Sequence, residues 1–401
     1  AQKRRYLTLL ELHAKNTGAD TPVVIVNAPG RTELAGNHTD HNNGCVLAAS
    51  VDLDCVVVAS PVEENKILLD SDQNEPIVIG LENLAPRLEE QGTAQALVRG
   101  VAAVFFRLTG VNKGFCAQLD ATCPPGKGLS SSAAFSVLIG HTLNVLFNDG
   151  QLSVETLAQI AKEAENDYFG KPCGLMDQLA SAVGQTVFID FYDQNVPVVE
   201  AIKFGLSGTG YKLAVIDTGG SHVELTPEYA AIPEEMFAAA GVLGAVSGRM
   251  VKLEAVFKNI GKIRKVVGDR AFLRLLHFVE ESERVERMAG CLKKNDFSGY
   301  LFLVKQSGLS SQQLLQNCSS SINSREQGIL VGLAMSQRIC SEVVCRVHGG
   351  GFAGTVQSYI PDDMFIEYTE KMEDIFGENS VFELEIGRPG VCCLTENGLT
   401  F

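Results

Sequence analysis

The sequence predicts an α+β protein with two domains. The chain has 401 residues, and at roughly 100–200 residues per domain two domains are the natural expectation. Its first half alternates strand-like and helix-like runs, and a helix-rich stretch from about Pro227 is followed by further strand-like runs. We place the boundary near residues 200–210, where glycines are frequent, and therefore expect domains at 1–205 and 206–401.

The strands expected in the first half are rich in β-branched residues. They are 21–28, 44–60 (one strand or two), 113–121 and 187–191. A buried helix is expected over 132–147, and a second over 153–169, where Ser153 is a suitable N-cap and apolar residues repeat at helical spacing. A short helix over 173–184 should end at Gly184.

The second half is expected to be mostly helical. A strand at 211–220 precedes the helical segments, which are 234–246, 271–290 and 325–337. The strand-like runs that follow are 341–348, 355–360 and 380–387. The longest apolar runs are far shorter than the ~20 residues that cross a bilayer, so we expect no membrane partner.

The formal charge of the chain is −15, from 48 acidic and 33 basic residues. Such an acidic surface repels a phosphate backbone, which argues against nucleic acid as a partner. It would also repel a nucleotide, so a nucleotide site must depend on backbone amides, a helix N-terminus and a metal ion.

Eleven cysteines are scattered along the chain without CxxC spacing. This argues against a disulfide framework and against a zinc site, and it indicates a reducing, cytoplasmic compartment. The first residues lack the layout of a signal peptide. The chain does not begin with Met, so its native N-terminus need not be Ala1.

A glycine- and serine-rich segment, PPGKGLSSSA at 124–133, stands between an expected strand and an expected helix. Glycines let the backbone approach a phosphate, and the helix start offers unpaired N–H groups and the positive end of the dipole. The segment matches neither GxxxxGK[ST] nor a Rossmann turn. We interpret it as a phosphate loop, with a simple capped helix as the alternative.

Two further segments concentrate polar or glycine residues. APGRTELAGNHTDHNNG at 28–44 carries the directional groups that suit a polyhydroxylated ligand, although a solvated loop would also explain them. GGGFAG at 349–354 fits GxGxxG, but the run that follows it reads as a strand and not as a helix. This argues for a glycine loop between antiparallel strands that can approach a ligand or another loop closely, with a plain tight turn as the alternative.

In this order, the three motifs resemble those of the GHMP kinase superfamily, and residues 28–44 resemble the galactokinase signature. Further segments follow in family order, at 88–101, 161–181, 221–229, 305–318 and 346–355. The resemblance implies an ATP-dependent kinase that phosphorylates the anomeric hydroxyl of galactose, with ATP and Mg²⁺ as cofactors. It also implies two α+β lobes with the active site in the cleft between them.

Position by position, the resemblance implies roles for individual residues. Arg31 should lie beside the transferring phosphate, and Asp177 should face the anomeric hydroxyl as general base or as orienting group. Ser132 and Glu165 should hold Mg²⁺. The expected sugar-binding residues are Arg31, Asn37, His38, Asp40, Gly174, Asp177 and Tyr229, with His222 setting the register of Tyr229. The expected nucleotide-binding residues are Pro125, Gly126, Lys127, Gly128, Leu129, Ser130, Ser131, Ser132, Ala133, Gly350 and Gly351.

The chain departs from the family pattern at three places. Asn37 replaces a Glu that binds the sugar 6-hydroxyl, and exchanging a charged for a neutral hydrogen bond costs roughly 1 kcal/mol, or about five- to tenfold in affinity. AQALVRG at 94–100 lacks the family's Trp and Tyr, and the chain has no Trp, so the adenine pocket must be lined differently. His348 stands where the family has Thr.

Three alternatives remain beside a galactokinase. Asn37 supports a kinase for another monosaccharide, such as an N-acetylhexosamine or a pentose. A non-catalytic sensor of sugar and ATP is disfavoured because Arg31, Asp177, Ser132 and Glu165 are all present. A nicotinamide-dependent dehydrogenase rests only on residues 349–354. The oligomeric state does not follow from the sequence.

Overall fold

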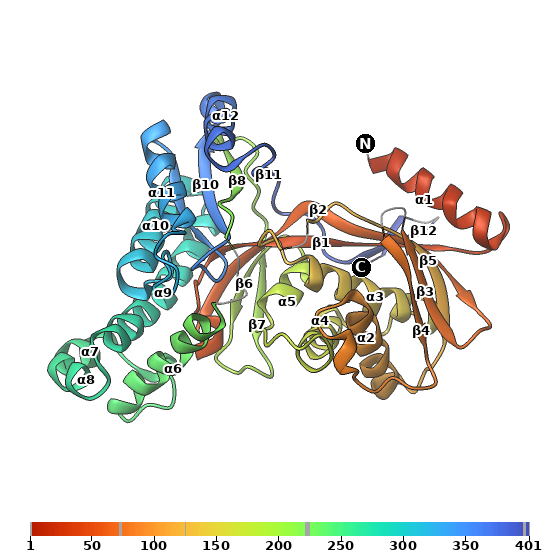
Figure 1. The fold of residues 1–401 in the computed structure, drawn as a ribbon, viewed down its shortest axis with the longest axis horizontal. Coiled ribbons are helices and arrows are strands. Elements are labelled where there is room, and N and C mark those ends of the chain that lie inside the picture. The colour runs from red at the N-terminus through yellow and green to blue at the C-terminus, as the bar shows by residue number, and fades with distance from the viewer. Residues whose placement is uncertain (1, 72–73, 125, 221–224, 396–397, 401) are drawn as a thin grey trace. The chain divides into compact units, whose positions relative to one another are not determined.

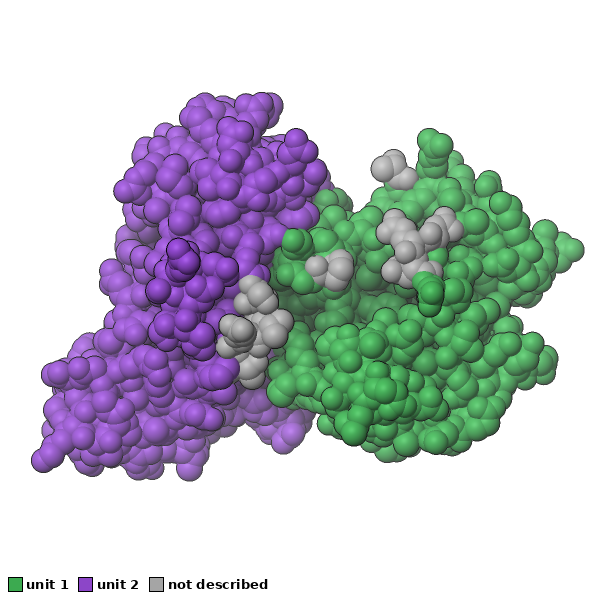
Figure 2. Space-filling view, viewed as in Figure 1, with its two compact units in different colours: residues 1–31, 50–185, 388–401 green, residues 32–49, 186–387 purple. Residues whose placement is uncertain are grey.

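The computed structural model describes residues 2–71, 74–124, 126–220, 225–395 and 398–400, and Figure 1 shows their arrangement. The chain forms two compact units, coloured separately in Figure 2: unit 1 comprises residues 1–31, 50–185 and 388–401, and unit 2 comprises residues 32–49 and 186–387. The sequence predicts one boundary near residue 205, whereas the chain changes unit after residues 31, 49, 185 and 387. The reason is that β1 (Val24–Ala35) and β2 (Cys45–Val62) are long strands that each belong partly to both units.

Unit 1 is a sheet covered by helices. The strand order is β13-β12-β1-β2-β5-β3-β4, and the pairs β2–β5 and β3–β4 are antiparallel while β3–β5 is parallel. Its further strands are β3 (Lys66–Ser71), β4 (Asn74–Gly80), β5 (Gly114–Ala121), β12 (Cys392–Thr395) and β13 (Gly398–Thr400). Its helices are α1 (Gln2–Thr17), α2 (Ala94–Thr109), α3 (Ser131–Phe147), α4 (Val154–Glu163) and α5 (Met176–Val183), with short turns η2 (Leu88–Glu90) and η3 (Ala164–Phe169).

The helices of unit 1 follow from their sequence patterns. α1 packs Leu9 against Val56 and Val58 of β2, and Figure 1 shows it on the opposite face of the sheet from α2–α5. α3 is apolar nearly all round and is therefore buried between neighbouring helices. The predicted N-cap Ser153 is confirmed, because its side chain accepts a hydrogen bond from the Thr156 N–H. The predicted helix over 153–169 is correct only to residue 163, since η3 continues it as a π-helical turn.

Unit 2 contains a four-stranded antiparallel sheet of order β11-β8-β10-β9. The strands are β8 (Tyr211–Asp217), β9 (Val344–His348), β10 (Thr355–Pro361) and β11 (Val381–Leu384). Two more strands, β6 (Thr186–Asp190) and β7 (Val198–Ile202), belong to the same nine-stranded sheet as β2: β6 pairs with the first residues of β2, and β7 pairs with β6. The helices are α6 (Thr226–Val242), α7 (Leu253–Lys258), α8 (Ile260–Val267), α9 (Asp269–Lys293), α10 (Phe297–Ser310), α11 (Gly328–Ile339) and α12 (Phe365–Phe376). The short turns are η1 (Asp40–Asn42), η4 (Gly248–Met250), η5 (Ser311–Leu315) and η6 (Asp362–Met364).

The two faces of β10 have different partners because successive side chains of a strand point to opposite sides. Val356 and Ile360 join a core with residues of α11 and α12. On the other face, the Tyr359 hydroxyl lies 2.6 Å from the hydroxyl of Tyr300 on α10, and the Gln357 amide donates to Thr32 Oγ1 of β1 at 2.8 Å. This second face therefore packs against the polar segment that begins with Thr32.

Two further properties concern the cysteines and the possibility of a membrane-spanning helix. All eleven cysteines are free thiols. Within the part of the chain that the structure describes, every helix is too short or too polar to span a membrane.

Candidate active site

The predicted phosphate loop leads from β5 into α3 in unit 1. Gly126 and Gly128 both have φ of 75°, in the left-handed region that glycine adopts readily. Pro125, which was also predicted for this site, lies outside the described residues. Ser130 precedes α3 with φ of 52° and makes no capping hydrogen bond with its side chain. The start of α3 thus has the geometry that binds anions, with backbone N–H groups and the positive end of the helix dipole.

Arg31 and Asp177 form an ion pair beside this loop. Arg31 Nε donates to Asp177 Oδ1 at 2.7 Å, and its Nη1 donates to the Gly128 carbonyl at 2.6 Å. Ser130 Oγ donates to the other carboxylate oxygen of Asp177. The Arg31 side chain is only 7% exposed, so the guanidinium is held in one orientation by the loop and by the carboxylate.

The surroundings of Asp177 keep its carboxylate ionised. Burial would raise the pKa, but the charge and hydrogen bond of Arg31, the hydrogen bond of Ser130 and the charge of Lys171 outweigh burial and lower the pKa below its ordinary value. Asp177 therefore accepts hydrogen bonds at neutral pH and carries a negative charge next to the phosphate loop.

Ser132 and Glu165 also lie together in unit 1. Ser132 Oγ, in the first turn of α3, donates to Glu165 Oε1 at 2.8 Å. Glu165 is 2% exposed and stands on the π-helical turn η3. Lys171 Nζ donates to the same Oε1 at 3.2 Å, and Gln178 Nε2 donates to Oε2 at 2.8 Å. The π-helical turn brings this carboxylate to the helix start.

The Ser132–Glu165 pair fits a magnesium ion. Hydroxyl and carboxylate oxygens are the hard ligands that Mg²⁺ prefers, and Mg²⁺ at phosphate sites usually takes one or two protein ligands and fills the rest with phosphate and water. No group of three or more His, Cys, Asp or Glu suited to a metal occurs among the residues described.

In unit 2, Asn37 is completely buried and its amide is fully engaged. Nδ2 donates to the Gly349 carbonyl at 2.6 Å and to Glu33 Oε1 at 3.3 Å. Oδ1 accepts from Asn317 Nδ2 at 2.6 Å and from Ser311 Oγ at 3.4 Å. An amide offers two N–H donors and two acceptor sites, so the protein itself satisfies this side chain.

The predicted sugar-binding residues His38 and Tyr229 lie against the glycine loop at 349–351. His38 Nε2 lies 2.8 Å from the Gly350 carbonyl, and the Tyr229 hydroxyl donates to the Gly351 carbonyl at 2.7 Å. Burial, followed by the charge of His41, lowers the pKa of His38 to about 3, so its ring is neutral. Because a carbonyl only accepts, Nε2 carries the proton and Nδ1 is left as an acceptor.

The glycine loop fits closely against these residues. A Cβ on Gly350 would lie 2.4 Å from Tyr229 Cε1, and a Cβ on Gly351, whose φ is 81°, would lie 2.2 Å from the Asn317 carbonyl oxygen. Successive carbonyls at 349, 350 and 351 are bound by Asn37, His38 and Tyr229. Only glycine allows this approach.

Replacing Tyr229 by Phe should weaken sugar use modestly. The variant loses the hydrogen bond that holds the Gly351 carbonyl; such a bond is worth about 1 kcal/mol, so kcat/KM for the sugar should fall by at most about fivefold, through displacement of the glycine loop. Tyr192→Phe, at a tyrosine that is 64% exposed, is the matched control and should change nothing. Equal kinetics for both variants would show that the Tyr229 hydroxyl has no part in the site.

The remaining predicted residues are placed as follows. Asp40 is in η1 and accepts from the His41 N–H at 2.9 Å, while Gly174 lies in the segment before α5. His348 is a packed side chain, with Thr32 Oγ1 and Thr355 Oγ1 each 3.0 Å from one ring nitrogen. His222, which set the register of Tyr229, lies outside the described residues.

Sequence reasoning missed several residues that contact the predicted ones. Lys171 and Gln178 bind Glu165, and both stand within the segment that carries Asp177, so their positions offered a signal. Asn317 binds Asn37, and Arg346 pairs with Glu33 at 2.5 Å across 313 positions of sequence. No local pattern in one sequence joins residues so far apart.

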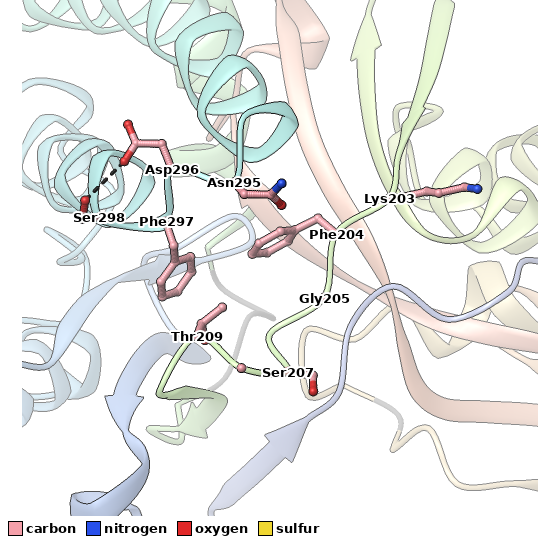
Figure 3. A pocket seen from close by; sticks show the side chains of 10 residues that line it. Lys203, Phe204, Gly205, Ser207, Thr209, Asn295, Asp296, Phe297 and Ser298 are labelled. Atoms are coloured by element: carbon pink, nitrogen blue, oxygen red, sulfur yellow. Dashed lines mark hydrogen bonds between the residues drawn. The ribbon is translucent and has the colours of Figure 1, made fainter.

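A cavity of about 520 Å³ lies elsewhere in unit 2, between the segment after β7 and the start of α10. Figure 3 shows Phe204 and Phe297 facing each other in it, and their ring centroids are 6.0 Å apart. Asp296, at its rim, caps α10 by accepting from the Gly299 N–H at 2.9 Å. The residues lining the cavity include none of the predicted site residues.

Comparison with protein families gives two matches. Residues 96–185 match the GHMP kinases N terminal domain, and residues 11–61 match the galactokinase galactose-binding signature. The second match contains the segment at 28–44, and the first contains the phosphate loop, Glu165 and Asp177.

Individual proteins resemble the chain over most of its length. A galactokinase of Streptomyces coelicolor is 30% identical over 359 residues, which cover 87% of each chain, and a galactokinase of Homo sapiens is 29% identical over 93% of each chain. Among solved structures, Lactococcus lactis galactokinase complexed with galactose matches with a TM-score of 0.80 at 23% identity, covering 95% of this chain and 98% of that one. A mevalonate kinase matches with a TM-score of 0.64 at 14% identity, covering 91% and 99%. At these identities the solved structures show a common fold.

Proposed function

The chain belongs to the galactokinase family of GHMP kinases, and we propose that it transfers the γ-phosphate of ATP to the anomeric hydroxyl of galactose. It is an ATP-dependent sugar kinase with the mixed helix and sheet fold of that family. The observation that carries the proposal is the ion pair of Arg31 and Asp177, at 2.7 Å, beside a glycine-rich helix start.

Phosphoryl transfer requires positioning and charge neutralisation more than covalent chemistry. We assign Arg31 to the developing charge on the transferred group, because its guanidinium is fixed by Asp177 and Gly128. Asp177 orients the sugar hydroxyl and accepts its proton as the bond to phosphorus forms. Ser132 and Glu165 would hold Mg²⁺, which supplies charge neutralisation at the phosphates when bound.

The remaining residues are assigned to ligands by their resemblance to the galactokinase family pattern. The loop at 125–133, together with Gly350 and Gly351, is assigned to the nucleotide. His38, Asp40, Tyr229 and Gly174 are assigned to sugar hydroxyls, and the acceptor nitrogen of neutral His38 suits a hydroxyl donor. The match of residues 11–61 to the galactose-binding signature supports the assignment of His38 and Asp40.

A second candidate is a kinase for another galactose-like monosaccharide. The observation that favours it is Asn37, whose amide is used by Gly349, Glu33, Asn317 and Ser311. A side chain that is satisfied within the protein contributes little to sugar selection, so substituents at the position that it would read are expected to be tolerated.

A substrate panel separates the two candidates. ADP release with ATP and Mg²⁺ is measured against galactose, 6-deoxygalactose, N-acetylgalactosamine, glucose and arabinose. We expect galactose to be phosphorylated, and 6-deoxygalactose to have a kcat/KM within about tenfold of it, because Asn37 provides at most one neutral hydrogen bond there. If only another sugar is phosphorylated, that sugar and not galactose is the substrate. If no sugar causes ADP release although sugar still binds, the result would favour a non-catalytic sensor.

We further propose that the protein works in the cytoplasm on small molecules. Eleven free thiols suit a reducing compartment, and the family's substrates are a sugar and ATP.

A further inference from the structure

Lys171 is a cation of unit 1 that the assigned mechanism does not use. It follows the π-helical turn η3 and Gly170, whose φ is 82°. Its backbone N–H donates to the Glu165 carbonyl and its Nζ donates to Glu165 Oε1, both at 3.2 Å. The lysine therefore folds back over Glu165 through backbone and side chain alike.

Lys171 balances the charge of the phosphate-side cluster. The cluster has two carboxylates, Asp177 and Glu165, and two cations, Arg31 and Lys171. Lys171 Nζ lies 3.2 Å from Glu165 Oε1 as an ion pair, as expected of a lysine ammonium ion beside a carboxylate. The same ammonium lowers the pKa of Asp177, which means that it acts on both carboxylates.

The two cations differ in freedom. The Arg31 side chain is 7% exposed and has two fixed partners. The Lys171 side chain is 57% exposed, whereas the Glu165 that it binds is 2% exposed. A lysine ammonium sits on a flexible four-carbon stem with three donors, so it can exchange partners while Arg31 stays in place.

Several groups compete for the Glu165 carboxylate. Its Oε1 accepts from Ser132 and from Lys171, and the proposed function assigns the same carboxylate to a divalent cation. An ammonium and a divalent cation on one carboxylate repel each other. Lys171 then leaves the carboxylate, and the strongest acceptors for an ammonium near a phosphate loop are phosphate oxygens.

We propose that Lys171 is an additional phosphate-contacting cation, which neutralises Glu165 in the free enzyme and turns to the phosphate chain of the bound nucleotide. The inference rests on the proposed function, since it needs a nucleoside triphosphate at the start of α3. Lys171 also competes with the divalent cation for Glu165 and so sets how tightly that cation binds without nucleotide.

Lys171→Met removes the ammonium and keeps the length of the side chain. We expect kcat/KM for ATP to fall about 10- to 100-fold, since a hydrogen bond to a charged group is lost. ADP binding, measured by calorimetry in EDTA, should weaken about tenfold or more. Mn²⁺ binding without nucleotide, measured by electron paramagnetic resonance, should become tighter. Lys15→Met, at an exposed lysine of α1, is the control and should change none of these.

A conservative variant separates phosphate contact from a structural role. Lys171→Arg keeps the charge and should restore ADP affinity to within about threefold of the original, because a guanidinium also binds phosphate. If Lys171→Met lowers the melting temperature and leaves ADP and Mn²⁺ binding unchanged, Lys171 is a structural counter-ion and the inference is wrong. If Lys171→Met does not fold, the same ADP and Mn²⁺ binding measurements are made on Lys171→Gln, whose amide can still donate to Glu165.

The inference can fail independently of the proposed function. A wild-type protein that phosphorylates galactose, with Lys171→Met equally active and equally tight for ADP, overturns the inference alone. A wild-type protein that turns over no sugar of the panel overturns the proposed function, and ADP binding in EDTA then still reports on Lys171.

Discussion

Replacing Asp177 by Asn is expected to lower sugar phosphorylation by about 10²–10⁴-fold, because proton acceptance by a positioned carboxylate contributes that much to proton-transfer steps. The amide keeps the size of the side chain and one acceptor for Arg31, so sugar binding should remain within about threefold. Single-turnover ADP release gives the rate, and calorimetry with galactose gives the affinity. Asp167→Asn, on the exposed side of η3, is the matched control and should retain full activity.

A rate within tenfold of the original would remove Asp177 from the chemistry. The pH profile gives an independent check. The pKa of Asp177 is lowered from its ordinary 3.8, so the carboxylate is ionised above about pH 4 and its contribution is lost only as pH falls through the lowered value. An acid limb of kcat near pH 6 that disappears in Asp177→Asn would contradict this description of the site.

Arg346→Met is expected to destabilise unit 2 by about 3–5 kcal/mol, because it removes the cation that forms an ion pair with the buried carboxylate of Glu33. Arg346 is fully buried, Glu33 is 3% exposed, and the two are joined at 2.5 Å. Burial would lower the pKa of Arg346, but Glu33 and Glu281 raise it, so the pair is ionic. Thermal unfolding should shift down by about 6–20 °C.

The double variant Glu33→Gln/Arg346→Met tests whether the loss comes from an uncompensated charge. It should recover most of the stability, since removing both members of a buried pair is often close to neutral. Arg338→Met, at an exposed arginine of α11, should stay within about 0.5 kcal/mol of the original. If the double variant is as unstable as Arg346→Met alone, packing and not charge explains the effect.

The elements predicted from local pattern are largely confirmed, because their signals lie in neighbouring residues. Ser153 caps α4, Gly184 ends α5, and the strand after the GGG run is β10. Residues 44–60, read as one strand or two, form the single strand β2. These features depend on caps, glycines and alternation, which are properties of a few adjacent side chains.

The features that the sequence could not predict depend on contacts between residues far apart in the sequence or on unusual backbone geometry. The π-helical turn at 164–169 breaks a regular helical repeat, and it carries Glu165, which lies within hydrogen-bond distance of Ser132. Asn37 stands between Gly36, with φ of 94°, and His38, with φ of 59°. These two conformations set the direction of its side chain, and the partners Asn317 and Gly349 come from much later in the chain.

The interleaving of the two units has a consequence for how the protein is made. β1 leaves the ribosome before the other strands that the structure describes, yet its pairing partner β12 begins only at Cys392. The sheet of unit 1 therefore stays incomplete while all of unit 2 is synthesised, and the exposed edge of β1 could pair wrongly during that interval. Each unit is built from segments that are separated in the sequence, so one unit cannot fold completely before synthesis of the other begins. For the same reason, neither unit can be expressed as a single uninterrupted fragment.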